Sequence, residues 1–185
     1  PVSLLDALTE LVDHSLVRAD PVPGDTPRFA MLETVREFAA EQLMALPGHE
    51  RARAAHAAAF RELAEGLARP PAGPDRVGLD QLEREHDNFR AALDHYGETE
   101  PGTALRLANR LTAFWSIRGH FSEGRRRLGE LLARVPDEDP ERVDALNGAA
   151  WLATDQGDGA AAVPLLDETL ARARAAGDRA GEATV

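Results

Sequence analysis

The chain has 185 residues, of which 43% are hydrophobic and 5% aromatic, and it carries a formal net charge of −11. This composition provides enough apolar surface for one domain or two small ones, and its abundant Ala and few aromatics suit closely packed helices. The sequence contains no Cys and no Lys, which excludes disulfides, Cys-bound metals, a P-loop lysine and Schiff-base chemistry.

Residues 1–48 are predicted to form a helix, a β-hairpin and a second helix. Apolar residues at helical spacing follow a possible N-cap at Ser3: Leu4, Leu5, Leu8, Leu11 and Val12. Two short extended stretches, residues 15–20 and 28–32, flank the turn-rich string PVPGDTP. A second amphipathic helix begins near Glu33 and is stopped by the Pro-Gly pair at its end. A helix followed by a hairpin is the wing end of a winged-helix domain.

Residues 49–98 are predicted to be a helical bridge. An Ala-rich helix over residues 50–68 ends at a pair of prolines. A loop is expected over residues 70–78, because three Pro and two Gly there prevent a continuous helix. One uninterrupted helix is then expected from residue 79 to residue 96, closed by Gly97.

The bridge contains three consecutive residues of metal-ligand types, Glu85, His86 and Asp87. Consecutive helical residues point about 100° apart, so these three cannot converge on one ion, and we expect no metal site. The expected role is structural: Glu83 and Asp87 form solvent-facing ion pairs with Arg84 and Arg90.

Residues 99–185 are predicted to consist of repeated helical hairpins. The strings GHFSEGRRRLGELL and GDGAAAVPLLDETL, which begin at Gly119 and Gly157, align at an offset of 38 residues. One such hairpin cannot bury its own apolar face, so neighbours must stack, as in a binding scaffold. Pro164 interrupts the last predicted helix, where we expect a local distortion or a delayed start. The sequence after Gly177 is interpreted as the connection to a third, truncated copy.

The two hairpin copies resemble tetratricopeptide repeats. The matching positions are Ala108, Leu111, Thr112 and Trp115 in the first copy and Leu146, Ala149, Ala150 and Ala153 in the second. The strings LVDHSLVRAD and RFAMLETVREFAAEQL resemble the winged-helix segment of STAND-class (NB-ARC-like) ATPases, especially large transcriptional regulators of high-GC bacteria. The string LEREHDNFRAALDH resembles the helix that joins this segment to the tetratricopeptide array in the same proteins.

This resemblance implies a mainly α chain: a winged-helix remnant, a helical bridge and a tetratricopeptide-type superhelix. It implies a non-catalytic regulatory segment whose array senses an inducer or binds a partner protein, including the protein's own nucleotide-binding module. ATP or ADP would bind that N-terminal module, and no cofactor is expected in this chain. No apolar run approaches the about 18 residues of a membrane helix, so we expect no membrane contact. The absence of Cys fits a reducing compartment, and we expect a cytoplasmic protein.

A winged-helix DNA-binding module is the alternative function. DNA binding requires positive charge to neutralise phosphates, whereas residues 1–48 contain eight acidic and three basic residues. DNA is therefore an unlikely partner of this segment. A hydrolase or transferase would need a polar cluster in an apolar pocket, and the sequence shows none, so we expect no enzyme activity.

In tetratricopeptide arrays the first helix of each hairpin lines the concave groove. The corresponding positions here are Arg106, Asn109, Ala113, Ser116, Ile117, Asp144, Asn147, Trp151, Thr154 and Asp155. Asn109 and Asn147 share one repeat position, which suits hydrogen bonds to a peptide backbone. Trp151 is either an anchor for a partner or a packing residue against the adjacent hairpin. The basic cluster of Arg125, Arg126 and Arg127 is either solvated surface or a docking patch, for an acidic partner segment or for nucleic-acid phosphates.

Overall fold

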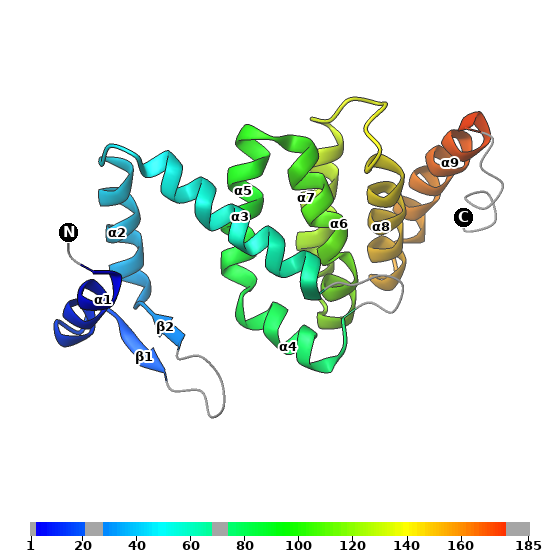
Figure 1. The fold of residues 1–185 in the computed structure, drawn as a ribbon. Coiled ribbons are helices and arrows are strands. Elements are labelled where there is room, and N and C mark those ends of the chain that lie inside the picture. The colour runs from blue at the N-terminus through cyan, green and yellow to red at the C-terminus, as the bar shows by residue number, and fades with distance from the viewer. Residues whose placement is uncertain (1–2, 21–27, 68–73, 177–185) are drawn as a thin grey trace. The chain divides into compact units, whose positions relative to one another are not determined.

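The computed structural model describes residues 3–20, 28–67 and 74–176. Within these ranges it contains nine helices and one two-stranded sheet (Figure 1). The chain divides into two compact units, unit 1 (Pro1–Ala52) and unit 2 (Arg53–Val185). None of the helices in the described part is long and apolar enough to cross a membrane.

Unit 1 has the predicted order of helix, hairpin and helix. Its elements are α1 (Leu4–Asp13), β1 (Arg18–Asp20), β2 (Arg28–Ala30) and α2 (Glu33–Met44). The Ser3 hydroxyl accepts a hydrogen bond from the Asp6 N–H at 3.1 Å, which confirms the predicted N-cap. The strands pair antiparallel with Arg18 opposite Ala30. The string PVPGDTP, residues 21–27, lies outside the described residues.

Unit 1 buries little apolar surface within its described residues, where Val17 is the one buried hydrophobic side chain. Two short helices and two three-residue strands are too few to cover each other's apolar faces. Large apolar side chains therefore remain exposed: Leu4, Leu5, Leu16, Phe29, Met31, Leu32, Phe38, Leu43, Met44 and Leu46.

The bridge consists of three helices, α3 (His49–Leu67), α4 (Arg76–Arg84) and α5 (His86–Thr99). The predicted loop over residues 70–78 is wrong for its last three residues, which belong to α4. The Asp75 side chain accepts a hydrogen bond from the Gly78 N–H at 2.8 Å and so caps the helix there. Residues 70–73 of the predicted loop lie outside the described part.

The single helix predicted for residues 79–96 is also wrong, because it is broken at Glu85. This residue has φ −100° and ψ 8°, and it ends α4 and precedes α5. The prediction that Gly97 ends this helix is wrong as well, since α5 continues to Thr99. The helix ends at Glu100, whose helical conformation is disfavoured by the proline that follows it.

Two helical hairpins follow, as predicted. The first contains α6 (Pro101–Arg118) and α7 (Phe121–Leu132), and the second contains α8 (Arg142–Asp155) and α9 (Gly159–Ala176). Gly119 and Gly157 both have φ 80°, a left-handed conformation that glycine adopts without strain.

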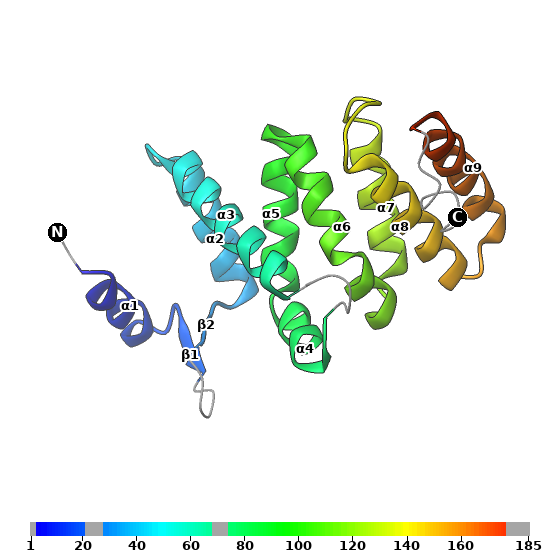
Figure 2. The same ribbon diagram turned by 45° about the vertical axis from the view of Figure 1, so that its right-hand side comes forward.

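The last helix differs from one expectation at Pro164. The helix begins at Gly159 and contains Pro164 in its interior, so its start is not delayed. The third copy predicted after Gly177 lies outside the described residues. Within unit 2, helices α5 to α9 lie side by side in chain order (Figure 2).

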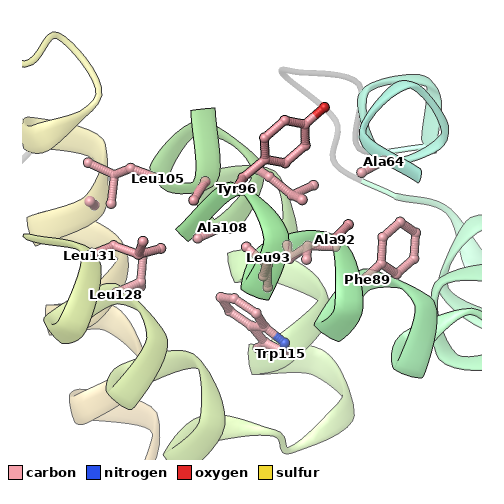
Figure 3. Packing of buried hydrophobic residues seen from close by; sticks show 14 of the residues in the cluster. Ala64, Phe89, Ala92, Leu93, Tyr96, Leu105, Ala108, Trp115, Leu128 and Leu131 are labelled. Carbon is pink, nitrogen blue, oxygen red and sulfur yellow. The ribbon is translucent and has the colours of Figure 1, made fainter. Parts of the chain in front are cut away.

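The main core of unit 2 draws side chains from α3 to α8. Figure 3 shows part of this cluster, with Ala64 of α3, Phe89 of α5, Trp115 of α6 and Leu128 of α7. The Trp115 side chain is fully buried and packs on the backbone of Gly124 in α7. A Cβ atom at Gly124 would lie 2.8 Å from Trp115 Cε3, closer than side-chain carbons approach each other.

We predict that Gly124→Ala destabilises the chain by about 1–3 kcal/mol relative to Gly129→Ala, because the added methyl collides with the rigid indole. Gly129 is the matched control: it lies in the same helix, and an added Cβ there would meet nothing within 4 Å. Helix propensity favours both changes by about 0.5–1 kcal/mol. Urea denaturation measures the free energies of unfolding, and equal values for the two variants would contradict the predicted collision.

Candidate binding groove

A groove of about 490 Å³ lies on the hairpins of unit 2. Its walls come mainly from α6 and α8, the first helices of the two hairpins, and one residue comes from α9. The lining residues are Asn109, Arg110, Thr112, Ala113, Glu141, Asp144, Asn147, Gly148, Ala150, Trp151, Thr154 and Leu166. Three of the candidate partner-binding residues, Asn109, Asn147 and Trp151, are thus brought together.

Small side chains form the groove where α6 and α8 approach each other. A Cβ atom at Gly148 would lie 3.0 Å from Thr112 Oγ1, so the two helices pack tightly at this point. Ala113 and Ala150 line the same region and fill little space. The hollow is therefore a consequence of residue size on two adjacent helices.

Arg106 and Asn109 are bound to the residue that precedes α8. Asn109 Nδ2 donates to the Glu141 backbone oxygen at 3.0 Å and to its carboxylate at 3.2 Å. Arg106 Nε donates to the other carboxylate oxygen of Glu141 at 2.9 Å. Asn109 Oδ1 is buried and has no hydrogen-bond partner within the described residues. These contacts connect the two hairpins and leave one amide oxygen unsatisfied beside the groove.

Asp155 and Arg125 are also engaged within the chain and do not line the groove. Asp155 accepts a hydrogen bond from Ser116 Oγ. Arg125 donates to Asp158 at 2.7 Å and to Gln156 at 2.6 Å. The hydrogen bond from Arg125 lowers the pKa of the Asp158 carboxyl.

The basic cluster is compensated by nearby acidic residues. Arg126 forms a hydrogen-bonded ion pair with Glu130 at 2.9 Å one helical turn away. The Arg127 side chain is only 12% exposed and pairs with Asp94 of α5. Arg127 is therefore not part of a solvated basic surface, because its position on α7 faces α5 and not solvent.

Four groove residues have no hydrogen bond or ion pair within the described part of the chain. They are Arg110, Asp144, Asn147 and Trp151. Trp151 is 47% exposed, and Arg110 and Asn147 are half-buried. Folded proteins normally pair polar groups that are removed from water, so these side chains are available to a ligand.

Six lining residues were not among the predicted groove positions: Arg110, Thr112, Glu141, Gly148, Ala150 and Leu166. Arg110 is the one polar side chain among these that has no hydrogen-bond or ion-pair partner within the described residues. The sequence signal for Arg110 is its spacing of three residues from Ala113, which places the two on neighbouring positions of one helix face. Conversely, four predicted groove positions do not line the hollow: Arg106, Ser116, Ile117 and Asp155.

We predict that acrylamide quenches Trp151 and not Trp115, since the first indole is half-exposed and the second is fully buried. The Trp151→Phe variant should lose most of the quenchable emission, and its remaining fluorescence should shift to the blue. Steady-state fluorescence of the folded wild type and variant measures this difference. If the wild type and the variant were quenched equally, Trp151 would not be solvent-accessible.

Comparison with known proteins finds sequence matches that cover both units of the chain. Residues 3–44 match the family described as "Winged helix-turn-helix domain". Two relatives are named "Putative HTH-type transcriptional regulator", one from Mycobacterium bovis and one from Mycobacterium tuberculosis. Each is 36% identical over 190 residues, which cover 97% of this chain and 21% of the relative. No solved structure shows significant similarity to this chain.

The chain spans about a fifth of the length of these curated relatives. The helix, hairpin and helix of unit 1 agree with the domain match, since α1, β1, β2 and α2 occupy the matched range. Residues 3–44 are thus similar to a winged helix-turn-helix domain, and nearly the whole chain is similar to one segment of HTH-type transcriptional regulators.

Proposed function

We propose that this chain is a regulatory, non-catalytic segment of a transcriptional regulator, in which tetratricopeptide-type hairpins bind a protein partner through the groove. The names of the relatives and the winged helix-turn-helix match support the regulatory role. The repeated hairpins with left-handed glycines at Gly119 and Gly157 support the tetratricopeptide type.

The observation that carries the proposal is the set of unpartnered side chains in one hollow. Asn147 offers both amide donors and an amide acceptor, and it lines the same hollow as the unpartnered Arg110 and Asp144. An extended peptide presents backbone N–H and C=O groups to such amides. Trp151 adds a half-exposed indole, a side chain that is enriched among the residues that dominate binding energy.

The first candidate partner is a nucleotide-binding module of the same polypeptide, of the STAND class. Such a module would bind ATP or ADP. A ligand that binds the hairpins would shift the equilibrium of the module between its ATP-bound and ADP-bound states. This coupling requires a ligand that binds the two states with unequal affinity. An external inducer of the array acts by the same principle.

Unit 1 offers a second contact surface for the module. Its exposed apolar side chains surround a hollow of about 380 Å³ lined by residues such as Leu11, Met31 and Phe38. Large exposed apolar patches mark interaction surfaces in soluble proteins. We therefore place unit 1 against another domain of the longer protein, with this apolar face covered.

Binding of DNA by unit 1 is the second candidate function, which the domain match and the names of the relatives favour. In a winged helix the recognition helix enters the major groove with basic and polar side chains. Here the helix before the hairpin, α1, carries Asp6, Glu10 and Asp13 and no basic residue. Its charge opposes contact with phosphates, so the protein-binding function is preferred.

We predict that Trp151→Ala weakens binding of the separately expressed nucleotide-binding module about 30-fold, the equivalent of about 2 kcal/mol. Asn147→Ala should weaken binding by a smaller factor, because it removes hydrogen bonds without apolar area. Val77→Ala is the matched control, since Val77 is an exposed apolar residue of α4 outside the groove. Titration calorimetry of the whole chain measures each dissociation constant.

A Phe38→Ser variant in unit 1 separates the two surfaces, because Phe38 is 62% exposed and lies outside unit 2. Loss of binding in Phe38→Ser with unchanged binding in Trp151→Ala would place the contact on unit 1 and contradict the groove assignment. Absence of any binding would contradict the module as the partner.

We predict that the chain does not bind duplex DNA at about 10 µM protein and 50 mM salt, because acidic residues predominate in unit 1. Fluorescence anisotropy of a labelled duplex measures this. Saturable binding that weakens steeply as salt rises would support the DNA-binding function instead.

A further inference from the structure

Three side chains of metal-ligand type gather in unit 2, away from the groove. They come from three places in the chain: Glu83 in the last turn of α4, His86 at the first residue of α5, and His120 in the turn between α6 and α7. One ligand atom of each lies within 4.8 Å of the others. His120 Nε2 lies 3.2 Å from each carboxylate oxygen of Glu83, and the two imidazole centroids are 4.4 Å apart.

An independent observation is the orphaned ring nitrogen of His86. The His86 side chain is 8% exposed, and its Nε2 atom is buried without a hydrogen-bond partner within the described residues. Its nearest acidic oxygen, on Glu123, is 3.4 Å away. That carboxylate is already occupied by Arg90, whose Nε and Nη2 donate to it at 2.9 Å and 2.5 Å.

The three side chains together form a donor set for a metal ion. Two imidazoles and one carboxylate each offer one ligand atom, and these atoms lie within 4.8 Å of one another. Transition metals bind this combination of nitrogen and oxygen donors.

We propose that Glu83, His86 and His120 bind one divalent transition metal ion of the Zn²⁺ class. Two imidazoles and one carboxylate are an established ligand set for zinc, with bonds of about 2.0–2.2 Å. Ligand atoms on a tetrahedral ion therefore lie about 3.3 Å apart, which matches the distance of 3.2 Å between His120 and Glu83. The ligand atoms of the three residues lie within 4.8 Å of one another, so His86 would move toward the other two when the ion binds.

The proposed ion has a structural role. Glu83 and His120 are partly exposed, so water can reach the fourth coordination position. The ion would connect the end of α4 and the start of α5 to the turn of the first hairpin. It would thereby fix the break at Glu85, where the backbone leaves the helical path. A ligand that binds only the folded state stabilises it by mass action.

The test uses the whole chain, freed of metal by a chelator, with Zn²⁺ alone as the probe. We expect one Zn²⁺ per chain by titration calorimetry. At a Zn²⁺ concentration about 100 times the dissociation constant, Tm should rise by about 5–10 °C. Replacement of Zn²⁺ by Co²⁺ should give the intense visible absorption of a four-coordinate site.

The test uses variants of the two partly exposed ligands, His120 and Glu83, and not of His86. His86→Ala removes a buried ring and can prevent folding, so a loss of Zn²⁺ binding in that variant would not be informative. His120→Ala and Glu83→Gln should each weaken Zn²⁺ binding at least about tenfold and abolish most of the Tm rise. His49→Ala is the matched control, since His49 is a partly exposed histidine that belongs to unit 1.

Two outcomes would overturn the proposal. One is the absence of Zn²⁺ binding by the folded wild type. The other is binding that His120→Ala and Glu83→Gln leave unchanged, or that His49→Ala removes, which would place the ion on another part of the chain. In either case the contact of His120 with Glu83 would be a hydrogen bond or ion pair only.

Discussion

The packing of unit 2 depends on the contact between the Trp115 indole and the bare backbone of Gly124. Three helices meet there, because the end of the Leu152 side chain from α8 also reaches the site where a Cβ would stand. The two helices of the second hairpin also pack closely, but with other residues. The positions equivalent to Trp115 and Gly124, 38 residues later, are Ala153 and Ala162, which pack together in a smaller cluster. A tryptophan against a glycine in the first hairpin thus corresponds to an alanine against an alanine in the second, and both combinations allow the helices to pack closely.

This close packing also creates the groove. Gly148 lets α8 approach Thr112 of α6, and the approach brings the Asn109 amide within 3.0 Å of the Glu141 backbone oxygen. The residues that can approach so closely are small, and small residues leave a hollow above them. The same two helices therefore bury their apolar faces in the core and present amides and an indole on the other side. The small residues between α6 and α8 therefore account both for the close packing of unit 2 and for its groove.

The sequence predicted the features that depend on local chemistry. Glycines at the two hairpin turns and an offset of 38 residues were enough to place α6 to α9. The break at Glu85 has no proline or glycine to mark it, and the apolar spacing continues across it, so it was not predictable. In the site, Asn147 and Trp151 were placed correctly by repeat position. The engagement of Arg106 and the proximity of His120 to His86 depend on residues more than thirty positions away, which sequence spacing cannot show.

The groove contains charged side chains without an ion-pair partner in the described residues, whereas arginines elsewhere in unit 2 form ion pairs. Arginines connect neighbouring elements throughout the unit: Arg90 with Glu123, Arg118 with Asp80, Arg125 with Asp158, and Arg172 with Asp137. Exposed pairs of this kind contribute little stability, but each holds an arginine against a carboxylate and so leaves neither group free for a protein partner. Arg110 and Asp144 have no such partner within the described residues, and they lie in the same hollow as the half-exposed Trp151. A partner that supplies one charge of each sign beside an apolar residue would meet its complement in the groove.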